Sequence, residues 1–233
     1  MGSEIKNKAV VITGASSGIG RSIAEAFLEK GAKVIVFGMN QPKTDVEFHK
    51  VDVSKEDEIK FALSKVKNID FLINNAGIAK IESVEKMSTK DMNEMIDINF
   101  KGIFWMSKYS IPKIKDGGCI INISSLAGLK SFEKYGIYCA TKSAVISLTK
   151  TLALELAQRK IRVNCIAPGV VDTGIWEKMY GRNGRKELKD CEDSIPLKRV
   201  GKPNEIAHAA LFFCENEFVN GQTISVDGGE SID

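Results

Sequence analysis

The sequence lacks the patterns that mark metal-binding and disulfide-linked proteins. No CxxC pair occurs, and neither histidine stands at metal-ligand spacing from a cysteine. We therefore predict no metal site and expect reduced thiols, as in the cytoplasm. The cysteines are Cys119, Cys139, Cys165, Cys191 and Cys214.

Long apolar runs and charge of one sign are also missing. No apolar stretch approaches the roughly 20 residues that cross a membrane as a helix, and the beginning of the chain shows no export signal. The 33 basic and 30 acidic side chains are spread along the sequence and give a formal net charge of +3. This composition argues against a nucleic-acid or membrane partner and favours a cytoplasmic protein.

Strand-like and helix-like segments alternate along the chain. With 233 residues, 43% of them hydrophobic, the chain suffices for one sizeable core, so we expect one domain over 1–233. The alternation predicts an α/β fold, a doubly wound Rossmann domain whose seven-stranded, mostly parallel sheet has helices on both faces. Start signals are expected at three helices: Ser54 for the second, Ser88 or Thr89 for the third, and Pro203 with Asn204 for the last. Strands are predicted over 9–13, 33–37, 46–51, 69–74, 119–124, 161–166 and 223–226, and helices over 19–30, 55–64, 88–108, 138–159 and 204–213.

The segment 172–202 breaks this alternation. It is polar, lacks a clear strand and carries three large side chains, Trp176, Met179 and Tyr180. We interpret it as a mobile lid or a substrate-binding insertion.

A glycine-rich turn, TGASSGIG over 13–20, follows the first predicted strand. Glycine allows a tight turn and a close backbone approach to a pyrophosphate, and the helix that follows offers free N–H groups and a positive dipole end. A plain strand-to-helix turn is the alternative, but the place in a β-α-β series favours a dinucleotide. We predict that Gly14, Gly18 and Gly20 serve the geometry. The approach is lined by Ser16, Ser17 and Ile19.

Three side chains form a second candidate site. Ser125 follows the fifth predicted strand, and Tyr138 and Lys142 stand at i and i+4 on one helix face. Hydride transfer to a carbonyl leaves an alkoxide that needs a proton, and oxidation of an alcohol needs that proton removed. We predict that Tyr138 exchanges the proton and that Ser125 donates a hydrogen bond to the substrate oxygen. The alternative for Tyr138 is a packing role.

This proton transfer requires an unusually acidic tyrosine. The reference pKa is about 10, so ionisation near neutrality needs a depression of roughly three units, or about 4 kcal/mol. An ammonium about 4 Å away, at an effective dielectric near 20, stabilises the phenolate by a comparable amount. We therefore expect Lys142 to supply most of the depression and an oxidised nicotinamide to supply the rest.

Further motifs follow in a fixed order: NNAG at 74–77, DIN at 97–99, PGVVDT at 168–173, NGQT at 220–223 and VDGG at 226–229. Together with the glycine turn and the Ser-Tyr-Lys set, they resemble the classical short-chain dehydrogenase/reductase family over the whole chain. The resemblance implies an NAD(P)-dependent oxidoreductase acting on an alcohol or carbonyl. It also implies that Asn99 is a fourth catalytic residue, which holds a helix kink and a water in a proton relay through Lys142.

The resemblance implies the remaining cofactor contacts as well. Asn75 and its neighbours would contact the adenosine side and stabilise the central sheet, Asp52 and Val53 would surround the adenine, and the nicotinamide would lie against the PG motif. Tyr138 and Lys142 would contact the cofactor too. Outside the glycine turn and the catalytic residues, the implied contacts are Gly38, Met39, Asp52, Val53, Asn75, Ala76, Gly77, Pro168, Gly169, Val171 and Thr173.

The choice between NAD and NADP stays open. Relatives that prefer NAD usually carry an aspartate at the end of the second strand, where this chain reads VFGMN over 36–40. The missing carboxylate leans toward NADP, although neither Ser17 nor Met39 is the arginine that NADP-dependent relatives often carry. Lys43 could reach a 2′-phosphate. The loop 40–47 is too short for the usual helix between these strands.

Two substrate classes remain. A sugar or polyol is favoured because no arginine cluster for an acidic carrier protein is evident near the mouth, and a 3-oxoacyl thioester is the alternative. A non-catalytic dinucleotide-binding regulator is the alternative of another class, against which Tyr138 and Lys142 together argue. Tyr135 is expected to form a pocket wall. Polar and stacking contacts to a sugar are expected from Lys80, Glu82, Glu133, Lys134 and Trp176.

An apolar stripe follows the long helix predicted over 138–159. It could be core, but the resemblance implies that this helix packs across a two-fold interface in a homodimer or homotetramer. The stripe consists of Ile137, Ala140, Ala144, Leu148, Leu152 and Leu156.

Overall fold

Seven strands form the centre of the protein in the computed structural model, which describes residues 5–232. Their order is β3-β2-β1-β4-β5-β6-β7, and every neighbouring pair is parallel. Strands β4 and β6 are buried along their whole length, as is typical of parallel sheets covered on both faces. The strands are β1 (Ala9–Thr13), β2 (Lys33–Gly38), β3 (Glu47–Lys50), β4 (Ile69–Asn74), β5 (Ile114–Ile123), β6 (Arg162–Pro168) and β7 (Thr223–Val226).

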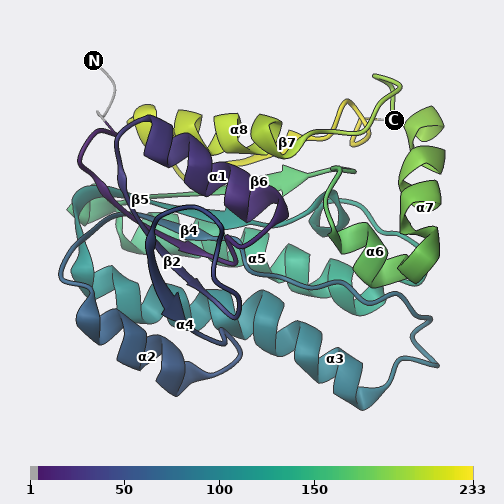
Figure 1. Cartoon of the computed structure of the whole chain (residues 1–233), viewed down its shortest axis with the longest axis horizontal. Helices are drawn as coiled ribbons and strands as arrows, with labels where there is room; N and C mark the ends of the chain where they lie inside the picture. Colours follow the sequence, from purple (N-terminus) through teal and green to yellow (C-terminus); the bar gives the residue numbers. More distant parts are fainter. Residues whose placement is uncertain (1–4, 233) are drawn as a thin grey trace.

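Helices cover both faces of the sheet, which confirms the predicted doubly wound Rossmann architecture (Figure 1). One layer contains α1 (Gly18–Glu29) and α8 (Pro203–Glu215), and the other contains α2 (Glu56–Lys65), α4 (Gly102–Ser110) and α5 (Gly136–Glu155). Alternate strand residues face alternate layers, so Val10 packs with the α1 and α8 core and Val11 with the other.

The order of the strands reverses at β1, which pairs with β2 on one side and β4 on the other. Ligands of open α/β sheets bind in the crevice outside the carboxyl ends of the strands at such a point. Here the crevice lies between the turn after Thr13 and the segment after Asn74.

Two predicted elements differ from the structure. The helix expected over 88–108 is divided into α3 (Thr89–Ile96), a π-helical turn (Asp97–Lys101) and α4. Strand β5 starts at Ile114 rather than Cys119, through exposed polar residues that an apolar pattern does not include.

The three predicted helix starts have different outcomes. Helix α8 starts at Pro203 as predicted, with Lys202 as its capping position. Ser88 caps α3 by accepting a hydrogen bond from the Asp91 N–H. Lys55, rather than Ser54, is the capping position of α2, because the Ser54 N–H donates to the Asp52 carboxylate in the preceding turn.

The segment 172–202 contains two short helices that the sequence does not predict, α6 (Ile175–Tyr180) and α7 (Gly184–Asp190). They lie beyond the carboxyl end of β6, on the right in Figure 1 near the C-terminal end of the chain. Gly184 allows their close packing, since a Cβ there would come within 2.6 Å of the backbone of Trp176 and Glu177. Between β2 and β3 no helix forms, as expected.

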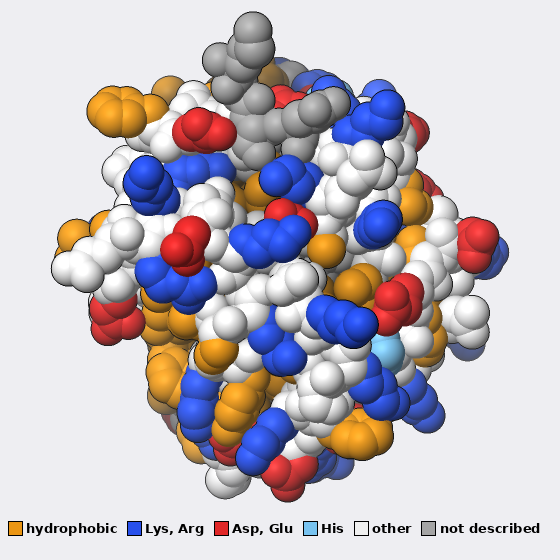
Figure 2. Space-filling view, turned by 90° about the vertical axis from the view of Figure 1, so that its left-hand side faces the viewer, with side chains coloured by type: hydrophobic (Ala, Val, Ile, Leu, Met, Phe, Trp, Pro, Cys, Tyr) orange, Lys and Arg blue, Asp and Glu red, His pale blue; other side chains and the backbone are white. Residues whose placement is uncertain are grey.

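Figure 2 shows the opposite end of the molecule, where Lys and Arg side chains are spread over the face with Asp and Glu among them. At the amino end of β4, Lys8 and Lys115 both pair with Asp70. No helix within residues 5–232 is long and apolar enough to cross a membrane. The same residues contain no group of three or more side chains that could hold a metal ion.

Arg162 joins the sheet to α8 from inside the core. Its side chain is 6% exposed, and its guanidinium donates to the carbonyl oxygens of Phe213 and Cys214 at the end of α8. The last carbonyls of a helix have no partner within the helix, so Arg162 satisfies two of them.

We expect Arg162→Leu to lower the free energy of unfolding by about 3 kcal/mol, because it leaves buried carbonyl groups without donors. Urea unfolding followed by circular dichroism measures the change. Arg21→Leu, which removes an exposed pair with Glu25, is the matched control and should cost no more than about 0.5 kcal/mol. Equal losses in the two variants would contradict this role of Arg162.

Candidate active site

The glycine turn joins β1 to α1 at the crevice. Gly14 and Gly18 have φ angles of 71° and 57°, in the left-handed region that favours glycine. A Cβ on Gly20 would lie 2.3 Å from the side-chain nitrogen of Asn75, so a larger residue has no room there. Ser17, the capping residue of α1, makes no side-chain hydrogen bond to the helix, which leaves the first N–H groups of α1 available to an anion.

The NNAG segment fixes the glycine turn from the β4 side. The Thr13 hydroxyl oxygen accepts from the backbone N–H groups of Asn75 and Ala76, each at 3.0 Å. The Asn75 side chain donates to the carbonyl oxygens of Thr13 and Gly14 at 3.0 and 3.1 Å. These contacts hold the ends of β1 and β4 together and keep the turn open for a phosphate.

Lys142 is buried beside the same crevice. Its Nζ donates to the Ile123 carbonyl oxygen at 3.0 Å, which is its one hydrogen bond among residues 5–232. Gly77 leaves room for the ammonium, since a Cβ there would lie 3.4 Å from Nζ and 3.3 Å from Asn99 Oδ1. An ammonium has three donors, so two remain for the ribose hydroxyls of a dinucleotide.

Asn99 lies within the π-helical turn between α3 and α4. Its Oδ1 accepts from the Ile78 N–H and its Nδ2 donates to the Ile78 carbonyl, each at 2.8 Å, and Nδ2 lies 3.4 Å from Thr141 Oγ1 on α5. A π-helical turn therefore lies where the resemblance implies a helix kink. Asn99 in this turn pairs with the segment after NNAG, and π turns are a common cause of kinks.

The two serines after β5 make separate contacts, consistent with opposite side-chain directions. Ser124 is buried and donates to the Lys142 carbonyl oxygen at 2.8 Å, which ties the strand end to α5. Ser125 accepts from the Ala127 N–H at 3.1 Å and is near enough to Tyr138 to lower its pKa as a hydrogen-bond partner.

The pKa of Tyr138 shifts in the direction opposite to the one expected from the sequence. Burial raises the pKa of Tyr138, and Ser125 offsets only part of the rise. Burial also lowers the pKa of Lys142 to about 8, because desolvation disfavours every charged form. The Lys142 Nζ lies 5.7 Å from the centre of the Tyr138 ring and donates to Ile123 instead. Lys142 was expected to supply most of the depression of the Tyr138 pKa. In the protein without cofactor this expectation is wrong, because the pKa of Tyr138 is raised.

The residues predicted for the adenosine side lie at the ends of β2 and β3. Gly38 ends β2 beside Gly14, and a Cβ on Gly38 would lie 3.8 Å from the Gly14 backbone, so a side chain has room there. Met39 is 54% exposed. Asp52 accepts a hydrogen bond from the Ser54 N–H, and Val53 is buried.

The residues predicted for the nicotinamide side lie after β6. Pro168 ends that strand, the Gly169 N–H donates to the Val226 carbonyl at 3.1 Å, and Val171 bridges to Gly201. Thr173 reaches the glycine turn, because its Cγ2 lies 3.3 Å from the place a Cβ of Gly18 would occupy. The phosphate and carboxamide ends of the predicted site thus meet in one crevice. The residues present fit a dinucleotide.

Two of the side chains expected to bind a sugar are engaged elsewhere. Lys80 forms ion pairs with Asp91 and Glu94 of α3. The indole of Trp176 is buried and donates to the Val171 carbonyl at 3.0 Å. The sequence pattern did not predict these partners, because the contacts form only when the loop that carries Lys80 packs on α3 and when Trp176 turns back to Val171.

Sequence reasoning also missed two contacts at the mouth. Tyr135, expected as a pocket wall, shares a hydrogen bond of 2.9 Å with the Tyr180 hydroxyl of α6. Glu230, near the end of the chain, lies against Gly169, with its Oε2 only 3.1 Å from where a Cβ of that glycine would be. The closing VDGG motif was the available signal for the latter.

The whole chain matches known oxidoreductases. A family model described as Enoyl-(Acyl carrier protein) reductase covers residues 14–231. A 3-oxoacyl-[acyl-carrier-protein] reductase from Chlamydia muridarum is 38% identical, over 98% of this chain and 99% of its own length. The ligand-free structure of an aldohexose dehydrogenase from Thermoplasma acidophilum superimposes with a TM-score of 0.93 at 33% identity, covering 100% of this chain and 97% of that one. The chain belongs to the short-chain dehydrogenase/reductase family.

The family membership establishes an enzyme that acts on hydroxyl or carbonyl groups with NAD(P)(H). Its members include different substrate specificities, since an NAD-dependent glycerol dehydrogenase from Listeria innocua is 33% identical over 98% of this chain and 95% of its own length. The predicted family and enzyme class are confirmed, whereas the substrate is not decided by similarity.

Lys142 should make the fold less stable than a neutral residue of its size would. Its folded pKa of about 8 lies below the ordinary 10.5, so unfolding takes up a proton between these values and the penalty is full below pH 8. Lys142→Met should therefore abolish turnover yet raise the free energy of unfolding at pH 7 by up to about 3 kcal/mol. The difference should shrink as the pH rises from 8 toward 10.5.

Urea unfolding of both proteins across this pH range measures the effect. Lys150→Met changes an exposed lysine of the same helix and should leave stability and turnover near those of the wild type. A Lys142→Met protein that is less stable at neutral pH, or whose stability follows the wild-type pH dependence, would refute the burial penalty.

Proposed function

We propose that this protein is an NAD(P)-dependent dehydrogenase whose substrate is a sugar or polyol. The dehydrogenase part of the proposal rests on the proximity of Ser125, Tyr138, Lys142 and Asn99 to one another beside the glycine turn. The substrate part rests on the charges of the segment 172–202. Binding alone would need the turn but not a partly buried tyrosine with an ammonium 5.7 Å from its ring centre.

Each of these residues has a distinct proposed role. The bound cofactor supplies or accepts the hydride. Tyr138 exchanges a proton at the substrate oxygen, and Ser125 donates a hydrogen bond to that oxygen as its charge develops. Lys142 holds the ribose hydroxyls with its remaining donors, and Asn99 positions the water that returns protons to Lys142.

The charges of 172–202 favour a small substrate over one linked to an acidic carrier protein. This segment has eight basic and six acidic side chains, so it presents no field of one sign. Arg185 pairs with Asp172 and Glu177, and Arg199 pairs with Glu205. The names of two similar proteins, the aldohexose and glycerol dehydrogenases, agree with a small polar substrate.

A 3-oxoacyl thioester reductase is the second candidate. It is favoured by the name of the Chlamydia muridarum relative and by the description of the matching family model. Both reactions use the same proton and hydride transfers, so the catalytic residues do not distinguish them.

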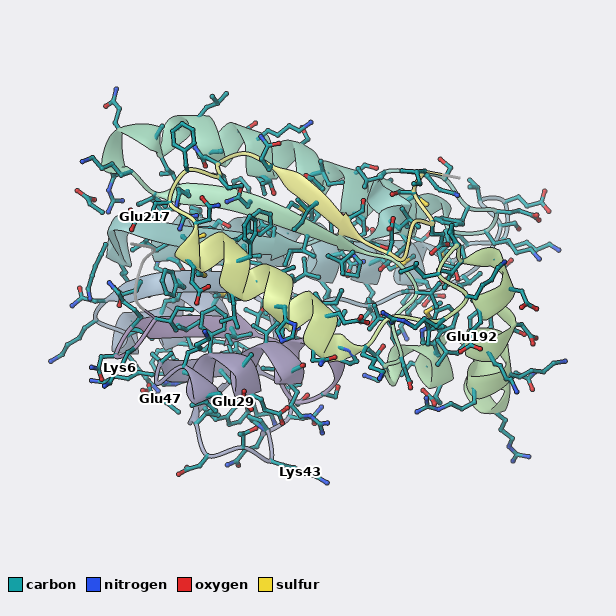
Figure 3. The ribbon with its side chains drawn as sticks, turned by 90° about the horizontal axis from the view of Figure 1, so that it is seen from above. Lys6, Glu29, Lys43, Glu47, Glu192 and Glu217 are labelled. Carbon is teal, nitrogen blue, oxygen red and sulfur yellow. The ribbon has the colours of Figure 1, made fainter. Side chains whose placement is uncertain are left out.

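We propose that the cofactor occupies the crevice with its pyrophosphate on the α1 N-terminus and its nicotinamide against Val171 and Thr173. NADP is favoured because β2 ends at Gly38 and no acid follows in residues 39–44. Lys43 is exposed and points away from the fold at the tip of the β2–β3 loop in Figure 3, so it contributes only if this loop folds back. The full set of proposed contacts is the one predicted from the sequence.

Three further features are proposed. Residues 172–202 act as a lid within a single domain of 1–233. The protein forms a homodimer or homotetramer through exposed apolar groups such as Phe104 of α4 and Leu154 of α5, which are 45% and 80% exposed. Its five free cysteines suit the cytoplasm.

Tyr138→Phe should reduce kcat by about 10³-fold or more while leaving the Kd of NADPH within about twofold, because it removes the proton donor and keeps the ring. Cofactor absorbance, followed with a panel of sugars, polyols and 3-oxoacyl thioesters, measures turnover. Tyr109→Phe, which removes a hydroxyl bonded to Glu56 and changes none of the proposed site residues, is the control. Near wild-type turnover by Tyr138→Phe would eliminate the mechanism, and NADPH binding without any turnover by the wild type would favour a regulator.

Gly38→Asp should shift the preference from NADPH toward NADH by about tenfold or more, because a carboxylate there would repel a 2′-phosphate and bind ribose hydroxyls. The Cβ fits without a clash, at 3.8 Å from Gly14. Gly38→Asn keeps the shape without the charge and should move the ratio of kcat/KM values much less. If both variants keep the wild-type ratio, the adenosine ribose does not lie at the end of β2.

A further inference from the structure

A continuous series of aromatic contacts connects the two halves of the active site. The Trp176 indole donates to the Val171 carbonyl at 3.0 Å, and its ring stacks on Tyr180 with 5.8 Å between ring centres and an angle of 9°. The Tyr180 and Tyr135 hydroxyls are 2.9 Å apart. The Tyr135 ring then meets the Tyr138 ring edge to face, with centres 6.1 Å apart.

Both ends of this series belong to the proposed catalytic site. Val171 lies in the loop proposed to hold the nicotinamide, and Tyr138 is the proposed proton donor. The segment 172–202 supplies Trp176 and Tyr180, whereas Tyr135 immediately precedes α5. Figure 3, seen from above, places this segment, marked by Glu192, at the far end of the molecule from Glu217. The aromatic series, called the arch below, thus joins the loop after β6 to the start of α5, beside the proposed position of the substrate oxygen.

The hydroxyl pair is the one link of the arch between the segment 172–202 and α5 that can open without unfolding a helix. Trp176 is 9% exposed and anchored to Val171, whereas Tyr135 and Tyr180 are only partly buried. Two phenols have two O–H donors, and their mutual hydrogen bond uses one. The second donor is left for a polar substituent of a substrate. When Tyr180 is the donor within the pair, the free O–H belongs to Tyr135, whose ring contacts that of Tyr138.

We propose that the Tyr135–Tyr180 hydroxyl pair is a clasp that closes the lid and determines the substrate class, admitting a compact substrate with several hydroxyl groups and excluding one attached to a long carrier chain. This inference rests on the proposed function of the site. A compact polyol fits beneath the closed arch and accepts the free O–H. A thioester on a pantetheine arm must keep its chain in the opening, which separates the two hydroxyls.

The clasp is tested with Tyr135→Phe, Tyr180→Phe and the double variant, which keep all the rings and remove only hydroxyl groups. The substrates are aldohexoses, glycerol, and acetoacetyl thioesters of N-acetylcysteamine and of pantetheine. Each single variant should lower kcat/KM for its best polyol about tenfold and raise it for the pantetheine thioester, at an unchanged Kd of NADPH. Because the hydroxyls act as a pair, the double variant should resemble either single variant. Tyr109→Phe should match the wild type.

The clasp is overturned if the single variants keep the wild-type ratio of polyol to pantetheine-thioester turnover, or if their effects add fully in the double variant. It is also overturned if the wild type reduces the pantetheine thioester faster than any polyol, an outcome that refutes the sugar assignment as well. Loss of turnover in Tyr138→Phe with an unchanged ratio in Tyr180→Phe would refute the clasp and retain the mechanism.

A second measurement keeps the clasp testable if no substrate in the panel is turned over. Trypsin can cut the segment 172–202 after Arg182, Lys186 and Lys189, all of which are exposed or at its surface. The expected result is about tenfold faster cutting there in Tyr180→Phe than in the wild type or Tyr109→Phe, with no change in global stability. Equal cutting rates would show that the hydroxyl pair does not hold the lid closed.

Discussion

The burial of the Lys142 ammonium is the constraint on which the rest of the site depends. A charge removed from water is tolerated only when polar groups surround it, and here the Ile123 carbonyl, the gap left by Gly77 and the nearby Asn99 oxygen provide that environment. The π turn holds Asn99 against the segment after β4, where its side chain pairs with Ile78. Desolvation of the ammonium costs stability, and a bound dinucleotide ribose would offset this cost by accepting hydrogen bonds from Lys142.

The sequence predicts the sheet well because its central strands are buried on both faces. β1, β4 and β7 have the expected bounds, and the short β2–β3 connection has no helix, as its length requires. The break between α3 and α4 was implied by the family resemblance at Asn99 but not by the apolar period, which continues through it. Helices α6 and α7 were not predicted either, because α7 depends on the close packing that Gly184 allows.

The candidate site was also identifiable from motifs, and the structure brings the predicted residues together at the crevice. The direction of the pKa shift of Tyr138 could not be predicted from motifs, because it depends on the burial of the phenol and on where Lys142 points. Spacing along a helix shows that the two residues share a face, but not that the ammonium donates to a carbonyl of β5. The Tyr135–Tyr180 contact was equally inaccessible, since it joins residues from segments whose relative position the sequence leaves open.

The central claim is that the phenol of Tyr138 becomes acidic only when a cationic cofactor joins Lys142 beside it. Ultraviolet difference titration of tyrosinate, comparing the wild type with Tyr138→Phe, isolates the ionisation of this residue with and without NADP⁺. The account predicts a pKa above the ordinary 10 for the protein alone and a fall of at least about one unit with NADP⁺, a fall that Lys142→Met loses. A low pKa without cofactor, or the same fall in Lys142→Met, would contradict it.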